Sequence, residues 1–279
     1  MIRKGKLAGF PFFLYISSEG IVVEILIYTL KFMRLLTNHR TIRSYQEKEI
    51  DNAVLNEILE SGIRASNTGN MQLYCVIVTR DTEKKKLLAP YHFNQPMVVQ
   101  APVLLTICLD INRFYKWCAI RQTEANFNNL LWLLNGTIDA SVFAQNICIA
   151  SENQGLGICY LGTTLYNANE ISAVLKLPPG VIPITALTIG YPQNIPEQTD
   201  RLPFEAVVHF EEYTDFDESR INDLYREKEN LESSVRFVAD NRKENLAQVY
   251  TEVRYKKADN DFFSKKLVKI LTDQGFRLD

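Results

Sequence analysis

Donor side chains suited to an anion gather in the run Asn38-His39-Arg40-Thr41-Ile42-Arg43-Ser44-Tyr45. Arg40 and Arg43 stand three residues apart, so on a helix they would occupy neighbouring positions of one turn. With His39 and the Thr41 hydroxyl they would form a fork of donors that matches a phosphate. An isolated Arg-x-x-Arg pair is far more often a solvated helix end. The run alone therefore carries little weight.

Three other places combine polar side chains with a glycine or a lone cation. The loop at 66–72, S-N-T-G-N-M-Q, precedes an apolar run, and its amides could hydrogen-bond the edge of a heteroaromatic ring. The segment at 160–164 follows a predicted strand, and its glycine would let the backbone approach a planar ligand. Arg201 ends a loop that is rich in Pro, Gln and Thr. Taken singly, the loop at 66–72 is better explained as a plain helix-to-strand turn, and the segment at 160–164 equally well as a strand-ending turn. Arg201 by itself could be an ordinary surface arginine.

Composition excludes several other functions. The chain has 279 residues, 46% of them apolar, and a formal net charge of -2, so it can bury a full core and has no overall electrostatic reason to bind nucleic acid. Its five cysteines form no C-x-x-C pair, and with only three histidines we predict no metal site. Mostly apolar neighbours around the cysteines indicate buried thiols in a reducing compartment, and we predict a cytoplasmic protein.

The first residues, MIRKGK followed by LAGFPFFLYI, imitate the basic and apolar regions of a signal peptide, but no small-x-small cleavage pattern follows. A transmembrane span over 10–33 would place Glu19 and Glu24 in hydrocarbon, at a cost of about 2.5 kcal/mol or more for a carboxylate near the centre. We therefore expect no stable membrane insertion. Residues 1–32 form an N-terminal extension, either a lineage-specific arm or an upstream extension of the reading frame.

The elements that would position these motifs follow from periodicity and turn signals. Helices are predicted at 50–63, 137–153 and 168–177. Buried strands are predicted at 73–81 and 101–110, and two further strands at 158–162 and 184–192. Strands that alternate with helices imply helices on both faces of one sheet. After Tyr213 a charged run leads into helical segments with too little continuous apolar surface to fold alone. We expect this tail to pack on the main domain or on a second subunit.

The order of the four motifs identifies a family. N-H-R-T-I-R-S-Y, then S-N-T-G-N-M-Q, G-L-G-I-C-Y-L-G, and I-G-Y-P followed by R-L-P resemble the nitroreductase family of FMN enzymes. The stretch 240–276, with D-N-R-K and I-L-T-D-Q-G-F, resembles its branch of NADPH-preferring flavin reductases and oxygen-insensitive nitroreductases with a long C-terminal arm. The resemblance covers the chain from about Arg34 onward. It implies an α+β three-layer fold, in which helices flank a central, mostly antiparallel sheet, and an obligate homodimer.

The resemblance also implies domain limits and a cofactor site. The FMN-binding domain would span 33–213 and the helical arm 214–279. The residues implied to bind FMN are His39, Arg40, Thr41, Arg43 and Arg201 at the phosphate and ribityl chain, Asn67 and Asn70 from a loop supplied across the dimer interface, Gln95 at the isoalloxazine ring, and Tyr160, Gly162 and Thr163 beneath it. The branch usually has a lysine two residues before the last arginine, where this chain has Thr199, so FMN retention could be weaker.

The nucleotide site rests on fewer residues. Arg242 and Lys243 align with a basic pair that recognises the 2'-phosphate of NADPH, and Arg236 lies close to another such position. A solvated helix face explains these residues equally well, so the choice between NADPH and NADH stays open.

The activity that the resemblance implies is that of a flavoprotein oxidoreductase. NAD(P)H would reduce FMN, leave, and be replaced by a nitroaromatic, quinone or flavin acceptor, in ping-pong order. No catalytic side chain is required because the cofactor carries the chemistry. Two alternatives remain: a flavin enzyme of the same fold with a different acceptor, and a non-catalytic flavin or ligand-binding module.

Overall fold

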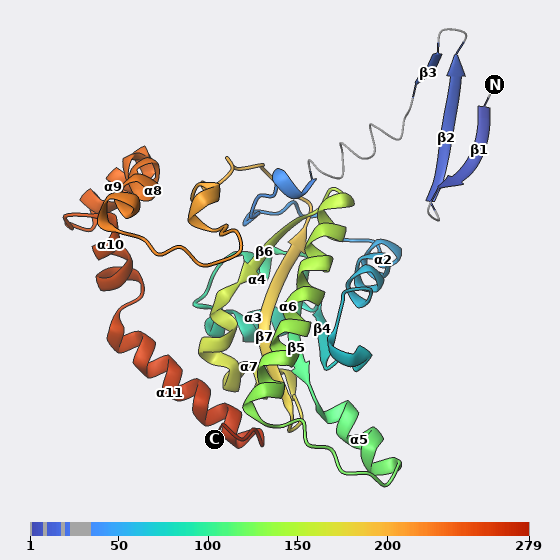
Figure 1. Cartoon of the computed structure of the whole chain (residues 1–279). Helices are drawn as coiled ribbons and strands as arrows, with labels where there is room; N and C mark the ends of the chain where they lie inside the picture. The colour runs from blue at the N-terminus through green and yellow to red at the C-terminus, as the bar shows by residue number, and fades with distance from the viewer. Residues whose placement is uncertain (1, 8–9, 18–19, 23–34, 279) are drawn as a thin grey trace. The chain divides into compact units, whose positions relative to one another are not determined.

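A computed structural model describes residues 2–7, 10–17, 20–22 and 35–278 (Figure 1). By its contacts the chain divides into two units, residues 1–197 with 274–279 and residues 198–273. These boundaries describe compact units and differ from the predicted domain limits at 32/33 and 213/214, which they do not test. The predicted limits therefore stay predictions.

The described residues before Val23 form a three-stranded antiparallel sheet. Its strands are β1 (Ile2–Leu7), β2 (Phe10–Ser17) and β3 (Gly20–Val22), paired in that order. Residues 23–34 lie outside the described part, so the apolar stretch 10–33 is covered only in its first half. Within the described ranges no helix is long and apolar enough to cross a membrane.

The main sheet has four strands, β4 (Tyr74–Thr79), β5 (Val103–Asp110), β6 (Gly157–Leu161) and β7 (Val181–Gly190), in the order β4-β5-β7-β6. All three pairings are antiparallel, as the family resemblance implies. Every residue of β5 is buried, as predicted for this run. The prediction that β4 is a buried strand was wrong, because β4 is an edge strand and most of its residues are only partly covered.

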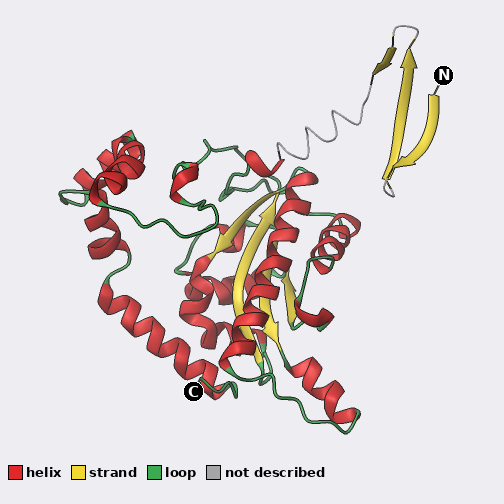
Figure 2. Cartoon of the chain, in the orientation of Figure 1, coloured by secondary structure: helices red, strands yellow, loops and turns green. Residues whose placement is uncertain are grey.

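Helices cover this sheet, as Figure 2 shows. The helices predicted at 50–63 and 137–153 correspond to α2 (Asn52–Ile63) and α6 (Leu130–Asn153), which pack on each other. The helix α6 begins at Leu130 rather than at Thr137, because Asn129 caps it by accepting a hydrogen bond from the backbone N–H of Trp132 at 3.1 Å. The prediction for its start was therefore wrong and that for its end correct.

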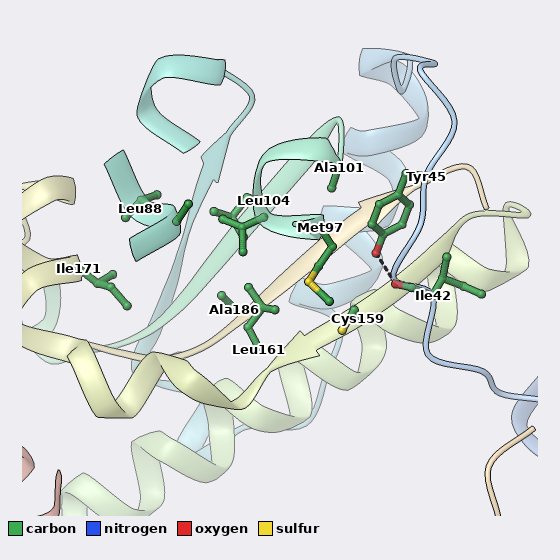
Figure 3. Close-up of a cluster of buried hydrophobic side chains, with 12 residues drawn as sticks. Ile42, Tyr45, Leu88, Met97, Ala101, Leu104, Cys159, Leu161, Ile171 and Ala186 are labelled. Atoms are coloured by element: carbon green, nitrogen blue, oxygen red, sulfur yellow. Dashed lines mark hydrogen bonds between the residues drawn. The ribbon is translucent and has the colours of Figure 1, made fainter. Parts of the chain in front are cut away.

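Shorter helices complete the first unit. They are α3 (Thr82–Leu88), α4 (Met97–Gln100), α5 (Asn112–Ile120) and α7 (Ala168–Leu175), with 3-10 turns at Thr68–Asn70, Ala89–His92 and Gly162–Asn167. Of these only α7 has a counterpart among the predicted elements. Figure 3 shows part of the core, in which Ile42 and Tyr45 pack with Met97, Leu104 and Leu161.

The second unit is helical, as predicted for the tail. It contains a 3-10 turn (Phe204–Ala206), α8 (Glu218–Asn230), α9 (Glu232–Asp240), α10 (Leu246–Gln248), a π-helical stretch (Val249–Arg254) and α11 (Lys257–Asp273). The caps are acid or amide side chains: Asp217 accepts from the N–H of Arg220 at 2.8 Å, and Asn245 accepts from that of Gln248 at 3.0 Å. Its fully buried apolar side chains are few.

Candidate functional site

The basic run at 38–45 is extended, which corrects the expectation that its arginines share a helical turn. Thr41 pairs with Ile158 of β6 in a parallel bridge, and the N–H of Ile42 donates to the Ile158 carbonyl at 2.8 Å. In an extended chain, residues three apart point to opposite sides. Arg40 is accordingly half-buried and Arg43 exposed. The sequence pattern could not show this, because the partner strand lies more than a hundred residues further along the chain.

Two glycines let this segment lie close against the sheet. A Cβ on Gly157 would lie 2.4 Å from Cγ1 of Ile42, and a Cβ on Gly190 would lie 2.7 Å from the Tyr45 ring. The Tyr45 hydroxyl donates to the Ile42 carbonyl at 2.7 Å (Figure 3). It also lies 2.8 Å from Oγ1 of Thr188. Burial raises the pKa of Tyr45, so it stays a neutral anchor.

The donors of the run have separate surroundings. The His39 ring Nδ1 lies 2.5 Å from the Glu152 carboxylate near the end of α6. Arg40 donates from Nη1 to the Asn38 carbonyl at 2.9 Å, and its buried Nε has no hydrogen-bond partner among the described residues. Burial raises the pKa of the Cys159 thiol, and the Arg43 guanidinium beside it opposes that shift. The two arginines therefore lie on opposite sides of the extended run, with Arg43 beside Cys159 of β6 and Glu152 oriented toward His39.

A second cluster lies where β6 ends. The His92 ring is fully buried, and its Nδ1 lies 3.0 Å from the hydroxyl of Thr163. Gln95 donates from Nε2 to the His92 carbonyl at 3.0 Å and more loosely to the same hydroxyl at 3.5 Å. The structure thus joins Gln95 and Thr163, which the resemblance assigned to one ring, through a histidine that the sequence analysis did not single out.

Open space adjoins this cluster at Gly162. A Cβ there would meet no atom within 4 Å, unlike the Cβ positions of Gly157 and Gly190. Tyr160, the last residue but one of β6, is 38% exposed and donates to Oε1 of Gln145 at 3.4 Å. Burial of its hydroxyl raises the pKa of Tyr160, so it acts as a neutral donor.

The loop at 66–72 is fastened to α6. Asp139, 2% exposed, accepts from both the N–H and the hydroxyl of Thr68, at 2.9 and 3.0 Å. Oδ1 of Asn67 accepts from the N–H of Gln72 at 3.1 Å, so this side chain supports the loop from within. Asn70 is exposed and has a left-handed backbone, with φ at 53°. Asn70 therefore presents its amide to solvent, whereas the Asn67 oxygen is already engaged.

Arg201 and the basic residues of the arm belong to the second unit. Arg201 donates from Nη1 to the Thr199 hydroxyl at 2.9 Å and to the Asp200 carbonyl at 2.8 Å. The threonine that replaces the family's lysine is thus a hydrogen-bond acceptor for the arginine. The Lys243 ammonium lies 2.6 Å from the Glu252 carboxylate, and Arg242 is exposed.

Arg236 lines a cavity of about 340 Å³ within this unit. Among the other residues lining it are Lys228, Ser233, Ser234 and Arg254. The Arg254 guanidinium lies 5.3 Å from the centre of the Phe237 ring. The sequence analysis did not single out Arg254, because eighteen positions and a change of helix type separate it from Arg236.

Comparison with known proteins decides the family. The model of the nitroreductase family matches residues 36–191. The FMN reductase (NADPH) of Bacillus subtilis is 31% identical over 207 residues, which is 70% of this chain and 83% of that protein. The oxygen-insensitive NADPH nitroreductase of Salmonella typhimurium is 31% identical over 186 residues, 67% of this chain and 76% of that one. The chain belongs to the nitroreductase family.

A solved structure extends the likeness beyond the matched segment. An oxidoreductase structure from Bacteroides fragilis superposes with a TM-score of 0.87 at 51% identity, covering 88% of this chain and all of that one. The predicted recognition of the nitroreductase family and of its α+β fold with an antiparallel sheet is therefore confirmed.

The residues of this nitroreductase fit the cofactor of its family. An FMN phosphate needs fixed cations and N–H donors, and the buried Nε of Arg40 is a donor that the described protein leaves unused. A planar ring needs backbone without a side chain beside it, and Gly162 offers this. Among the described residues no group of His, Cys, Asp and Glu could hold a metal ion.

Proposed function

We propose that this chain is an FMN-dependent oxidoreductase that takes hydride from NADPH or NADH and passes electrons to nitroaromatic, quinone or flavin acceptors. The observation that carries the proposal is the pairing of the basic run with β6, the strand that leads into Gly162 and Thr163. Donors suited to a phosphate and an uncovered backbone position at Gly162 thus adjoin one strand, as the binding of a flavin mononucleotide would require.

The basic run would hold the phosphate end. Arg40 and Arg43 supply charge, Thr41 a hydroxyl, and His39 a ring that Glu152 orients. The resemblance alone assigns Arg201 to this phosphate; within the second unit its guanidinium donates to Thr199 and Asp200. With no G-x-G-x-x-G motif in the chain for a dinucleotide pyrophosphate, FMN is favoured over FAD.

The turn at 92–95 and the end of β6 would hold the ring. Gln95 and Thr163 are hydrogen-bonding side chains tied to each other, and Tyr160 and Gly162 border the open surface. FMN supplies the hydride and electron chemistry when bound. The protein residues position it, donate hydrogen bonds to its edge, and keep water from that edge; no side chain needs to act as acid, base or nucleophile.

The choice of substrates follows the relatives. The Bacillus subtilis protein is described as an FMN reductase that uses NADPH, and the Salmonella protein as an NADPH nitroreductase. Both kinds of acceptor are planar and electron-poor, and each could replace the nucleotide over one open face in ping-pong order. Arg236, Arg242 and Lys243 are the proposed contacts of the NADPH 2'-phosphate.

A homodimer is supported by an exposed apolar stripe on α6. Leu130, Leu134, Ile138 and Val142 follow each other at four-residue spacing and are 45%, 54%, 58% and 37% exposed. Asp139, next to Ile138, anchors the loop that carries Asn67 and Asn70. A partner that covers the stripe would therefore also bring this loop to a second copy, in line with a site shared across a two-fold interface.

The visible spectrum of the purified protein tests the function. A yellow protein that NADPH bleaches, and that releases FMN on denaturation, supports the proposal; yellow but inert protein points to a binding role, and a protein that stays colourless after incubation with FMN overturns the proposal. Arg43→Ala should weaken FMN binding about tenfold or more, the effect of one charge-assisted contact. The exposed Arg64, at the end of α2, gives the matched control Arg64→Ala.

A further inference from the structure

We infer that His92 is a positioning residue: it donates a hydrogen bond from Nδ1 to Thr163 and so leaves the Thr163 hydroxyl proton free to donate to the ring bound at the end of β6. The inference rests on the proposed function for the identity of that ring. The arrangement of His92, Gln95 and Thr163 carries it.

The Gln95 amide has only one orientation that fits its neighbours. Its Nε2 lies 3.0 Å from the His92 carbonyl, which can only accept, so this atom must be the donor. The same nitrogen lies 3.5 Å from the Thr163 hydroxyl, and it can only donate there as well. One lone pair of that hydroxyl therefore faces a donor.

Among the described residues, the other hydrogen-bonding neighbour of the hydroxyl is Nδ1 of His92, at 3.0 Å. If Nδ1 carries the proton, Thr163 accepts two hydrogen bonds and its own proton is available to a third group. If Nε2 carries the proton instead, the hydroxyl donates to His92 and has nothing left to donate. The tautomer of His92 thus decides whether Thr163 is a donor to a ligand.

Burial of His92 favours the first arrangement. The ring is 0% exposed, and Nε2 has no hydrogen-bond partner in the described part of the chain. A proton on Nε2 would create a buried N–H without an acceptor, which folded proteins tolerate less often than a bare acceptor. With burial lowering the pKa of His92 to about 4, the ring is neutral near pH 7 and one nitrogen holds the only proton.

The backbone fixes the positions of His92 and Gln95 relative to each other. Phe93 and Asn94 both adopt left-handed conformations, at φ of 54° and 53°. The N–H of Gln95 then returns to the His92 carbonyl at 3.2 Å, which closes a tight turn between the two side chains. The geometry of the pair is therefore set by the chain itself, before any ligand binds.

The direct test is the tautomer of His92 in the full-length protein, with and without FMN. Long-range proton–nitrogen spectra of the chain labelled at its histidine nitrogens distinguish protonated from bare nitrogens, and His92→Asn assigns the signal by its loss. We expect the proton on Nδ1 in both states. A proton on Nε2 in wild-type protein that binds FMN overturns the inference alone, whereas wild-type protein that binds no FMN overturns the proposed function.

A pair of variants tests the consequence through the dissociation constant for FMN. His92→Leu removes the donor and should weaken FMN binding about fivefold, the effect of one neutral hydrogen bond. His92→Asn keeps an amide donor near Nδ1 and should bind nearly as wild type. Tighter FMN binding by His92→Leu would show that the Thr163 hydroxyl had been donating to His92. Equal weakening of FMN binding in both variants would show that His92 has a packing role only. Either result contradicts the inference. If His92→Leu does not fold, the tautomer of the wild type still decides.

Discussion

Polar residues near the candidate site hold neighbouring loops and side chains in place. Asp139 holds the loop at 66–72 through two hydrogen bonds, and Glu152 orients His39. His92 differs from these, because its surroundings disfavour its charged form: desolvation by burial lowers its pKa to about 4. A histidine kept neutral in this way links the pH dependence of folding to the geometry of the site.

His92 predicts a loss of stability in mild acid. Its pKa is lower in the folded than in the unfolded state, so the unfolded chain binds a proton first as the pH falls below about 6.5. The free energy of unfolding should drop by about 3 kcal/mol between pH 6.5 and pH 4 through this group, and no further below that. Urea denaturation at several pH values measures it, with His92→Asn as the control that should lose this part of the slope. An unchanged slope in that variant would contradict the prediction.

At the scale of elements, the glycines at the two ends of β6, Gly157 at its start and Gly162 directly after it, have opposite surroundings. Gly157 lies under Ile42, with no room for a Cβ, whereas Gly162 borders open space. Gly157 allows the basic run to lie against the strand. Gly162 leaves the backbone after the strand uncovered, where the proposed flavin ring would lie.

The two glycines give a matched pair of variants. Gly157→Ala should destabilise the fold by about 1 to 3 kcal/mol, because its Cβ would lie 2.6 Å from that of Ile42, and should weaken FMN binding with it. Gly162→Ala should leave the stability of the FMN-free protein within about 0.5 kcal/mol but lower its FMN occupancy. Thermal unfolding and flavin titration of both variants check this. Full FMN binding by Gly162→Ala would show that the ring does not lie over this position.

At the scale of the whole molecule, the proposed dimer would form through the exposed apolar stripe along α6. The light-scattering mass should be twice the 32.1 kDa of the chain at micromolar concentration. Leu134→Lys with Ile138→Lys would place two charges on the stripe and should yield monomers without bound flavin, since both would be buried against the partner. Leu87→Lys, at a residue of α3 that is 58% exposed, is the control and should stay dimeric. An active, flavin-loaded monomer would contradict the shared site.

The proposed contacts of the arm with the electron donor can also be tested at this scale. Replacing Arg242 and Lys243 by alanine should raise the KM for NADPH about tenfold or more and leave NADH turnover and FMN occupancy nearly unchanged, because NADH lacks the 2'-phosphate. Lys269→Ala removes a charge from the same arm, where Lys269 pairs with Asp273, and should have no such effect. Parallel shifts for both nucleotides, or none, would assign the basic pair a structural role, for which the contact of Lys243 with Glu252 already provides a basis.

The sequence by itself determined the features that depend on neighbouring residues and on motif order. Apolar periodicity located α2 and β5, and the order of four short motifs identified the family that the comparisons confirm. It did not locate the start of α6, since the amide cap of Asn129 looks like any loop residue until the helix behind it is seen.

Only the tertiary structure decided what depends on contacts between distant segments. Arg40 and Arg43 lie on an extended segment because Ile158 offers that segment a backbone partner, which no spacing within the run could reveal. His92 matters because folding brings Thr163 to within 3.0 Å of its ring and excludes water from its other nitrogen. Hydrogen bonds and burial of this kind form only when distant segments of the chain pack together. The positions of the site residues therefore depend on the fold, whereas the chemistry of their side chains follows from the sequence.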